Sequence, residues 1–328
     1  MFEFNLCKRV NSDFIIDVSF KVDAEKISAI IGRSGAGKST ILNLISGVIS
    51  LDSGFIKKDG VDLDFNTVLV HERQFGYIQQ QSLLFEHLSV LENLIYNNKV
   101  GEVLLSKYIK MFELEPHLHK KAGKLSGGEA QRVSIVRTLM TKPQLLLFDE
   151  AFSALDKKLR LKLRNDLKQL KTELNIPIIF ITHDLNEAYE LGDEIIVIEK
   201  GKIIEMGSSR QLFEQCKYVA TAKLMGIANI FTSEQIKSEL FETRELSNSE
   251  AIAIKATQIS LEATGVEAKI GDIKLQLDVV VIELRLDNLT KPLIMNISHL
   301  EYHKQEIIVG QVVYIKIHQV IYLEKTYD

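Results

Sequence analysis

The stretch Ile27-Ser28-Ala29-Ile30-Ile31-Gly32-Arg33-Ser34-Gly35-Ala36-Gly37-Lys38-Ser39-Thr40 decides the fold of this chain. It opens with an apolar, β-branched run that predicts a buried strand. It continues into the pattern G-x-x-x-x-G-K-[ST], and helically spaced apolar residues follow. A strand, a glycine-rich loop and a helix in this order place backbone N–H groups and a helix N-terminus around anionic oxygens. The sequence therefore predicts a phosphate loop that binds a nucleotide.

Each residue type in this loop has a physical reason. Glycines let the backbone turn tightly around the phosphates, the lysine can reach the β- and γ-phosphates, and the serine hydroxyl can bind Mg²⁺. The nucleotide-binding residues expected here are Gly32, Arg33, Ser34, Gly35, Ala36, Gly37, Lys38, Ser39 and Thr40. Kinases, GTPases, helicases and transport motors all use such a loop, so the remaining chain must narrow the function.

A second apolar run, residues 145–148, ends in two carboxylates, Asp149 and Glu150. A carboxylate at the end of a buried strand can hold Mg²⁺, which we expect of Asp149. The next carboxylate can orient and deprotonate an attacking water, which we expect of Glu150. The pair predicts nucleotide hydrolysis.

A third segment, Ser126-Gly127-Gly128-Glu129, opens a helix that Pro143 ends. Its backbone N–H groups form a second anion site on the same chain. Two anion sites on one chain are explained if two copies associate and each bound nucleotide contacts both copies.

Short apolar runs alternate with amphipathic stretches through residues 1–228, which predicts an α/β nucleotide-binding domain with a mostly parallel sheet. Within it, residues 85–142 lose the strand pattern and read as a helical subdomain, with helices expected over 88–96 and 103–114. The polar residues 229–250 are expected to form a linker. Residues 251–328 carry strand-like runs separated by turn signals at Gly271-Asp272, Asp287-Asn288 and Gly310, which predicts a small all-β domain.

Composition excludes several classes of protein. The 328 residues include 40 Lys+Arg and 44 Asp+Glu, a net charge of −4, which argues against a nucleic-acid partner. No signal peptide is expected, and no run approaches the roughly 20 apolar residues of a membrane span. Cys7 and Cys216, far apart in sequence, are expected to be free thiols.

Together these segments resemble the ATP-binding subunit of ABC transporters. Residues 32–39 look like its Walker A motif, residues 125–129 its signature and residues 145–150 its Walker B motif. The resemblance adds Asp156 as the D-loop aspartate, His183 as the switch histidine that contacts the γ-phosphate, and Gln80, between Gln79 and Gln81, as the Q-loop glutamine. It implies catalytic roles for Glu150, His183 and Gln80, with Ser39, Gln80 and Asp149 around Mg²⁺. Two departures are Ala151 and Glu86, which stand where the family commonly has proline.

The resemblance also implies partners and a location. Two copies would pack head to tail, so that ATP on one phosphate loop meets the SGGE segment (residues 126–129) of the other. The pair would drive integral-membrane permease subunits, and indirectly serve a substrate-binding protein, from the cytoplasmic face of the inner membrane as a peripheral subunit. The helical insert would receive the permease.

The C-terminal residues resemble the small TOBE/Mop-like β-barrel of importer ATPases, and the whole chain resembles the molybdate-importer ATPase. This implies uptake of molybdate or a similar oxyanion. The alternatives are an importer ATPase for sulfate, iron, a sugar or a polyamine, or a soluble ABC ATPase outside transport. A phosphate-loop kinase is a third class, but it has no use for the SGGE segment.

Overall fold

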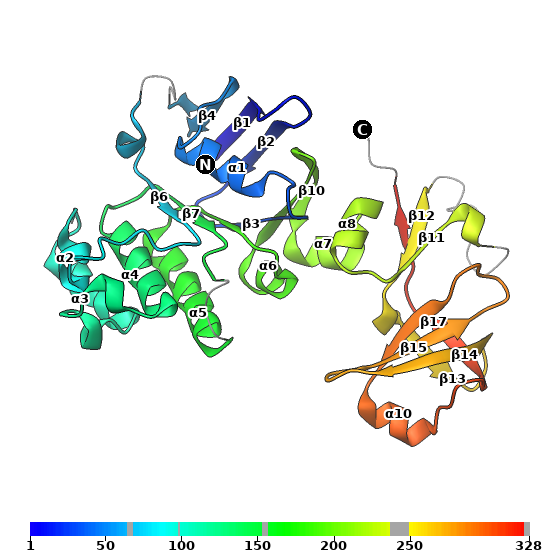
Figure 1. Ribbon diagram of the computed structural model, residues 1–328. Helices are drawn as coiled ribbons and strands as arrows, with labels where there is room; N and C mark the ends of the chain where they lie inside the picture. The colour runs from blue at the N-terminus through cyan, green and yellow to red at the C-terminus, as the bar shows by residue number, and fades with distance from the viewer. Residues whose placement is uncertain (64–67, 98, 153–156, 237–248, 325–328) are drawn as a thin grey trace. The chain divides into compact units, whose positions relative to one another are not determined.

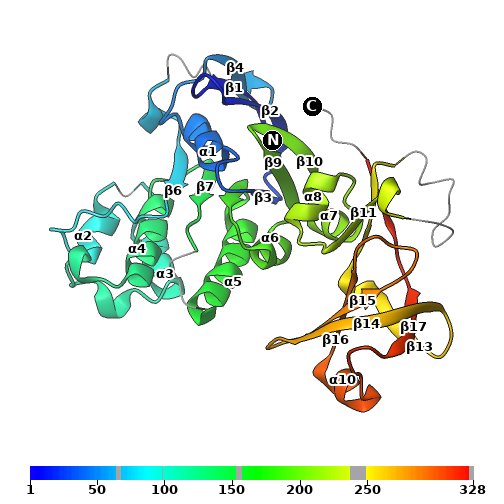
Figure 2. The same ribbon diagram turned by 45° about the vertical axis from the view of Figure 1, so that its right-hand side comes forward.

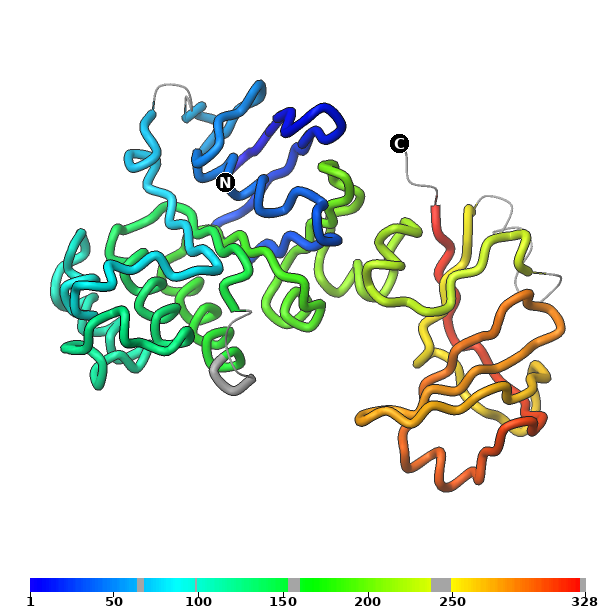
Figure 3. Tube along the Cα trace, in the orientation of Figure 1, coloured from blue at the N-terminus to red at the C-terminus, as the bar shows by residue number. Residues whose placement is uncertain are grey.

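The computed structural model describes residues 1–63, 68–97, 99–152, 157–236 and 249–324 (Figure 3). It divides into two compact units, Met1–Arg210 and Gln211–Asp328. This division falls earlier than the boundary expected at residue 228. The reason lies in the second unit's core, where Cys216 and Ala222 pack with strand residues near the C-terminus, such as Leu323.

The first unit is built on a ten-stranded sheet in the order β5-β4-β1-β2-β10-β9-β3-β8-β7-β6 (Figure 1). Strands β9, β3, β8, β7 and β6 run parallel to one another, and β10 pairs antiparallel with β9. Strands β1, β2, β4 and β5 form an antiparallel flank. The strand bounds are β1 (Phe2–Arg9), β2 (Ile15–Val22), β3 (Ile27–Gly32), β4 (Ser53–Lys58), β5 (Val61–Asp62), β6 (Phe75–Ile78), β7 (Leu145–Asp149), β8 (Ile178–Ile181), β9 (Glu194–Glu199) and β10 (Lys202–Ser208).

Helices accompany the parallel strands. They are α1 (Lys38–Ser46), α2 (Val90–Ile95), α3 (Glu102–Met111), α4 (Gly127–Leu139), α5 (Lys157–Leu174), α6 (Leu185–Leu191) and, at the junction of the units, α7 (Ser209–Gln215). The expected helices over 88–96 and 103–114 are found as α2 and α3, and these lie beside α4 in both ribbon views (Figures 1 and 2). Strands β3 and β8 are buried throughout, as parallel strands between helical layers should be. The predicted α/β phosphate-loop fold is therefore confirmed.

The second unit contains antiparallel sheets. One has the order β11-β12-β18 and the other β13-β17-β14-β15-β16. The elements are α8 (Val219–Leu224), β11 (Asn229–Thr232), β12 (Ala251–Ile254), β13 (Ile259–Glu262), β14 (Val266–Leu275), β15 (Val280–Arg285), β16 (Leu293–Ile297), α10 (His299–Gln305), β17 (Val312–Ile317) and β18 (Ile321–Leu323). A C-terminal β-rich unit is confirmed, with helices added to it.

Two expectations for this region differ from the structure, and residues 237–248 of the expected linker lie outside the described residues. The expected linker 229–250 begins with strand β11, because the buried amide of Asn229 donates to the carbonyls of Ile254 (3.0 Å) and Ile294 (2.7 Å). The expected turn at Gly271-Asp272 lies inside strand β14, where the pairing with β15 shifts register. A β-bulge keeps the strand going through a dipeptide that usually ends one.

Candidate functional site

The phosphate loop joins β3 to α1. Gly37 caps α1 in the left-handed region, with φ 102°. A Cβ on Gly37 would stand 2.4 Å from Ile16 Cδ1 and 3.1 Å from Phe14 Cζ, so only glycine fits. The first turn of α1 therefore begins directly at the loop, with its N–H groups available to an anion.

Lys38 is buried beneath this loop. Its ammonium donates to the carbonyls of Gly32 (2.9 Å) and Arg33 (3.1 Å). Burial lowers the pKa of Lys38, and the nearby Glu150 and Asp149 carboxylates oppose that shift. The loop thus holds one cation that is largely removed from water and faces the acidic end of β7.

Asp149 ends β7 among hydroxyl groups. Ser39 Oγ donates to Asp149 Oδ1 at 2.9 Å, and the Tyr77 hydroxyl lies 3.1 Å from Asp149 Oδ2 and 3.0 Å from Asn43 Oδ1. Burial raises the pKa of Asp149, while the bonds from Ser39 and Tyr77 oppose that shift. Sequence reasoning missed Tyr77, because one tyrosine in the strand sequence FGYI reads as a core residue.

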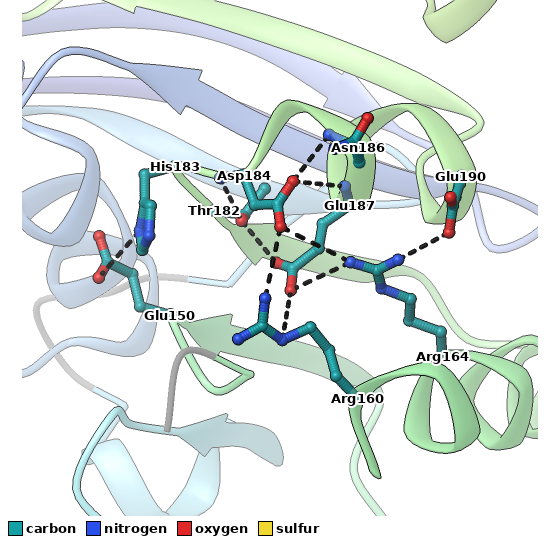
Figure 4. Close-up of polar contacts among 9 residues, drawn as sticks. All are labelled: Glu150, Arg160, Arg164, Thr182, His183, Asp184, Asn186, Glu187 and Glu190. Carbon is teal, nitrogen blue, oxygen red and sulfur yellow. Dashed lines mark hydrogen bonds and ion pairs between the residues drawn. The ribbon is translucent and has the colours of Figure 1, made fainter. Parts of the chain in front are cut away.

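Glu150 and His183 face each other across the ends of β7 and β8. His183 Nδ1 lies 3.6 Å from Glu150 Oε2 (Figure 4). Glu150 has φ 47°, an uncommon backbone conformation for a side-chain-bearing residue, and its N–H donates to the Ile181 carbonyl at 3.2 Å. Strained backbone of this kind concentrates at functional sites. The turn aims the Glu150 carboxylate away from its strand.

These residues surround one hollow of about 470 Å³, which we call the phosphate-loop hollow. It is lined by Phe14, Gly32, Ser34, Gly35, Gly37, Lys38, Ser39, Thr40, Glu150 and His183. Of the other expected loop residues, Ala36 is buried in the core beneath the loop and Arg33 is exposed. The structure therefore brings the phosphate loop, the Walker B carboxylates and the histidine together.

Gln80 does not line the phosphate-loop hollow, but it lies at the same edge of the sheet as Glu150. It follows β6, whose Ile78 pairs with Phe148, so Gln80 and Glu150 leave neighbouring parallel strands at matching positions. The Gln80 side chain is exposed. Functional residues thus follow β3, β8, β7 and β6 at one edge of the sheet, where open α/β sheets bind their ligands.

The SGGE segment lies elsewhere. Ser126 caps α4, where its hydroxyl accepts from the Glu129 N–H at 3.3 Å and Glu129 Oε2 accepts from the Ser126 N–H at 2.7 Å. This capping box lowers the pKa of Glu129, chiefly through the backbone bond from Ser126. Ser126 and Gly127 are exposed, and a Cβ on Gly127 would meet open space. This segment does not line the hollow of its own chain.

Asp156 lies outside the described residues. Within the described parts of the chain, no helix has the length and apolar content needed to cross a membrane.

Comparisons with known proteins show which family this chain is similar to. The family model described as ABC transporter fits residues 15–153. A spermidine/putrescine import ATP-binding protein PotA of Pasteurella multocida is 36% identical over 291 residues, 86% of this chain and 73% of that protein. A sulfate/thiosulfate import ATP-binding protein CysA of Bacillus cereus is 30% identical over 328 residues, 92% of this chain and 91% of that protein. A solved dimeric ATP-binding cassette in a post-hydrolysis state with ADP and Pi superposes with a TM-score of 0.56 and 28% identity, over 64% of this chain and 99% of that one.

Proposed function

Because the chain belongs to the ABC transporter family of ATP-binding subunits and is an ATPase, we propose that it powers import of a solute through separate permease subunits. The observation that carries the proposal is the phosphate-loop hollow, where Lys38, Glu150 and His183 meet on one chain. Its import-type relatives support the direction of transport.

In this proposal each side chain has one task. Lys38 neutralises the β- and γ-phosphates as a buried cation. Glu150 accepts a proton from the attacking water, and His183 holds that water and the γ-phosphate in line. Gln80 and the loop residues Gly32, Ser34, Gly35, Gly37 and Thr40 complete the nucleotide site. Phe14, in the lining of the hollow, is our candidate for stacking on adenine.

The residues present fit a magnesium ion. Ser39 Oγ and Asp149 Oδ1 lie 2.9 Å apart. A hydroxyl oxygen and a carboxylate oxygen are the protein ligands that Mg²⁺ uses beside nucleotide phosphates. Bound there with ATP, the ion would neutralise charge on the β- and γ-phosphates. Ser39 and Asp149 would hold it, and Tyr77 would fix the carboxylate that does so.

Asp149→Asn is expected to weaken ATP binding in the presence of Mg²⁺ and to leave binding without Mg²⁺ within about twofold. The amide keeps the shape and can still meet Ser39 and Tyr77, but it loses the charge that a divalent cation requires. Calorimetric titration with ATP, with Mg²⁺ and with a chelator, measures this difference. An unchanged metal dependence would show that Asp149 is not the metal partner.

A second copy of the chain would complete the site. The SGGE segment is exposed and contributes nothing to the hollow of its own chain. In a head-to-tail pair, the N–H groups that open α4 would face the γ-phosphate on the partner's loop. The similarity to a dimeric cassette bound to ADP and Pi supports this arrangement. Asp156, outside the described residues, remains the proposed D-loop aspartate.

The permease would dock on the helical subdomain. Phe85 packs against Tyr96 with ring centroids 4.6 Å apart, and the Arg137 guanidinium lies 5.4 Å from the centre of the Phe85 ring. Arg137 also donates to the Leu83 carbonyl at 2.5 Å. Leu83, which shortly follows Gln80 in the chain, and Tyr96, which packs against Phe85, are exposed apolar side chains. Such a patch suits the apolar face of a membrane protein's cytoplasmic segment. Bound there, the subunit would be peripheral on the cytoplasmic face of the inner membrane.

Tyr96→Ser is expected to leave the ATPase activity of the isolated subunit within twofold and to abolish its stimulation by co-reconstituted permease. Tyr96 is part of the proposed docking patch and does not line the phosphate-loop hollow. Val61→Ser, an equally exposed apolar position on β5, is the matched control. Stimulated activity that survives Tyr96→Ser, or falls as far with Val61→Ser, would contradict the docking surface.

The transported solute is proposed as an oxyanion, with molybdate and sulfate as the candidates. The near-complete coverage of a sulfate/thiosulfate import ATPase supports the class, and molybdate rests on the resemblance of the phosphate loop and the β-rich unit. The similarity to a spermidine/putrescine import ATPase makes a polyamine the second candidate. Uptake of each solute by cells expressing the chain with its permease tests the choice.

The β-rich unit is proposed to be the TOBE/Mop-like domain. One hollow of this unit, of about 420 Å³, is lined by described residues that include the carboxylate Glu262 and no lysine or arginine. Such a lining does not favour an oxyanion there. We therefore assign this unit to contacts between copies of the chain rather than to sensing the solute.

A further inference from the structure

Two arginines of α5 reach the turn that carries His183. Arg164 Nη2 lies 3.3 Å from Glu187 Oε1 and its Nη1 lies 2.6 Å from Glu190 Oε2. Arg160 Nη1 lies 3.4 Å from Asp184 Oδ2, and its Nε lies 3.5 Å from Glu187 Oε1. Figure 4 shows both guanidinium groups converging on the acidic residues around α6.

The centre of this group is withdrawn from water. The side chains of Arg164 and Glu187 are only 9% and 5% exposed. Burying two charges costs several kcal/mol per ion, and an ion pair repays this only in good geometry. A buried ion pair stabilises a fold little more than apolar residues of the same volume would, but it holds its charged groups in one arrangement. The role of this pair is therefore the arrangement that it maintains.

It holds the backbone on both sides of His183. Thr182 Oγ1 donates to Glu187 Oε2 at 2.6 Å and accepts from the Asp184 N–H at 3.0 Å. Asp184 Oδ1 accepts from the N–H groups of Asn186 (2.8 Å) and Glu187 (3.3 Å), which caps α6. The residues before and after His183 are thus fixed by the carboxylates that the arginines hold. His183 itself is 67% exposed, so this turn gives it its position.

We propose that Arg164 is a positioning residue for ATP hydrolysis, acting through Glu187 and Thr182 on His183. This rests on the proposed function, in which His183 and Glu150 act on one water. Helix α5 follows β7 in the chain, beginning at Lys157, and its arginines bond Asp184 and Glu187, which follow β8. Arg164 thereby sets the separation between His183 and Glu150 that the reaction uses.

The test compares Arg164→Lys with Lys168→Met, an exposed position one turn further along α5. Lysine keeps the charge but cannot bond Glu187 and Glu190 at the same time as the forked guanidinium does. We expect kcat for ATP hydrolysis to fall about tenfold and KM to stay within twofold, because a misplaced catalytic group costs up to about 10² in rate. Lys168→Met should change neither.

A readout independent of activity follows the imidazole itself. The chain has 8 histidines, and His183→Ala identifies the His183 signal in spectra of ¹³C-histidine-labelled protein. Arg164→Lys and Thr182→Val, which removes the hydroxyl but keeps the branched shape, should both shift that signal and leave the others in place. In the His183→Ala background, Arg164→Lys should lower kcat by less than twofold further.

The outcomes separate the two proposals. An unshifted His183 signal in both variants would overturn the positioning role, as would a tenfold loss of kcat from Arg164→Lys when His183 is already absent. Parental hydrolysis by His183→Ala would instead contradict the role of His183 in the proposed function, while the shifted signal would still show that Arg164 positions it. If Arg164→Lys fails to fold, Thr182→Val carries the same test.

Discussion

Replacing Glu150 with Gln is expected to lower ATP hydrolysis by about 10²–10⁴-fold, the usual contribution of a positioned general base. Glutamine keeps the length and shape of the side chain and can occupy the same strained turn, with φ 47°, at the end of β7. It cannot accept the proton of the attacking water. ATP binding should stay within about threefold of the parent, because Lys38, Ser39 and Asp149 are unchanged and no charge pairing with ATP is lost. Single-turnover hydrolysis and calorimetric ATP titration measure the two effects.

The same substitution should trap the closed pair of subunits. If hydrolysis resets the pair, a chain that binds but does not cleave ATP should stay dimeric, with each SGGE segment against the partner's nucleotide. Light scattering should therefore report a dimer of Glu150→Gln with ATP and a monomer without it. Ser126→Arg, added to that variant, places a bulky side chain at the exposed cap of α4 and should abolish the dimer while ATP still binds.

Two results would contradict these assignments. Parental hydrolysis by Glu150→Gln would exclude Glu150 as the base. An ATP-dependent dimer that survives Ser126→Arg would mean that the SGGE segment is not at the interface. Glu129 provides a control on the same segment, since Glu129→Gln keeps an acceptor for the Ser126 N–H and should preserve the dimer.

Much of the first unit could be predicted because its parallel strands are buried on both faces. Residues 27–31, 145–148 and 178–181 read as nearly all-apolar runs, and all lie in strands of the central sheet. Motifs at the ends of such strands must meet, because parallel strands share one carboxyl edge. The meeting of Lys38, Asp149, Glu150 and His183 was therefore readable from their positions after strands.

What could not be predicted depends on contacts distant in sequence. Asn229 reads as part of a polar linker, yet it is buried because it bonds to Ile254 and Ile294, which only the fold brings near. Tyr77 reads as a core residue, but its hydroxyl reaches Asp149 on the neighbouring strand β7. Arg160 and Arg164 read as the solvated face of an amphipathic helix, because their acidic partners follow a different strand.

Lys38→Met is expected to weaken ATP binding by between about 30-fold and 3,000-fold, since removing one member of a buried charge pair costs roughly 2–5 kcal/mol and each 1.4 kcal/mol is tenfold. The side chain is buried beneath the phosphate loop, and among the described residues that line the hollow Lys38 is the one lysine. Methionine retains the apolar stem, so the loop and the fold should persist. Lys26→Met, at the opposite end of β3 where Lys26 pairs with Asp23 and Glu194, is the matched control.

Thermal unfolding distinguishes lost binding from lost structure. Without nucleotide, the variant should melt within a few degrees of the parent. Burial lowers the pKa of Lys38, which means that its charged form does not stabilise the folded chain beneath the loop. At ATP concentrations 100-fold above the parental Kd, ligand binding should stabilise the parent by about 2.7 kcal/mol. A variant with 100-fold weaker affinity would gain only about 0.4 kcal/mol from the same ATP. A full ATP-induced shift in Lys38→Met would show that the phosphates are held by another cation, and the assignment of the hollow to ATP would have to be abandoned.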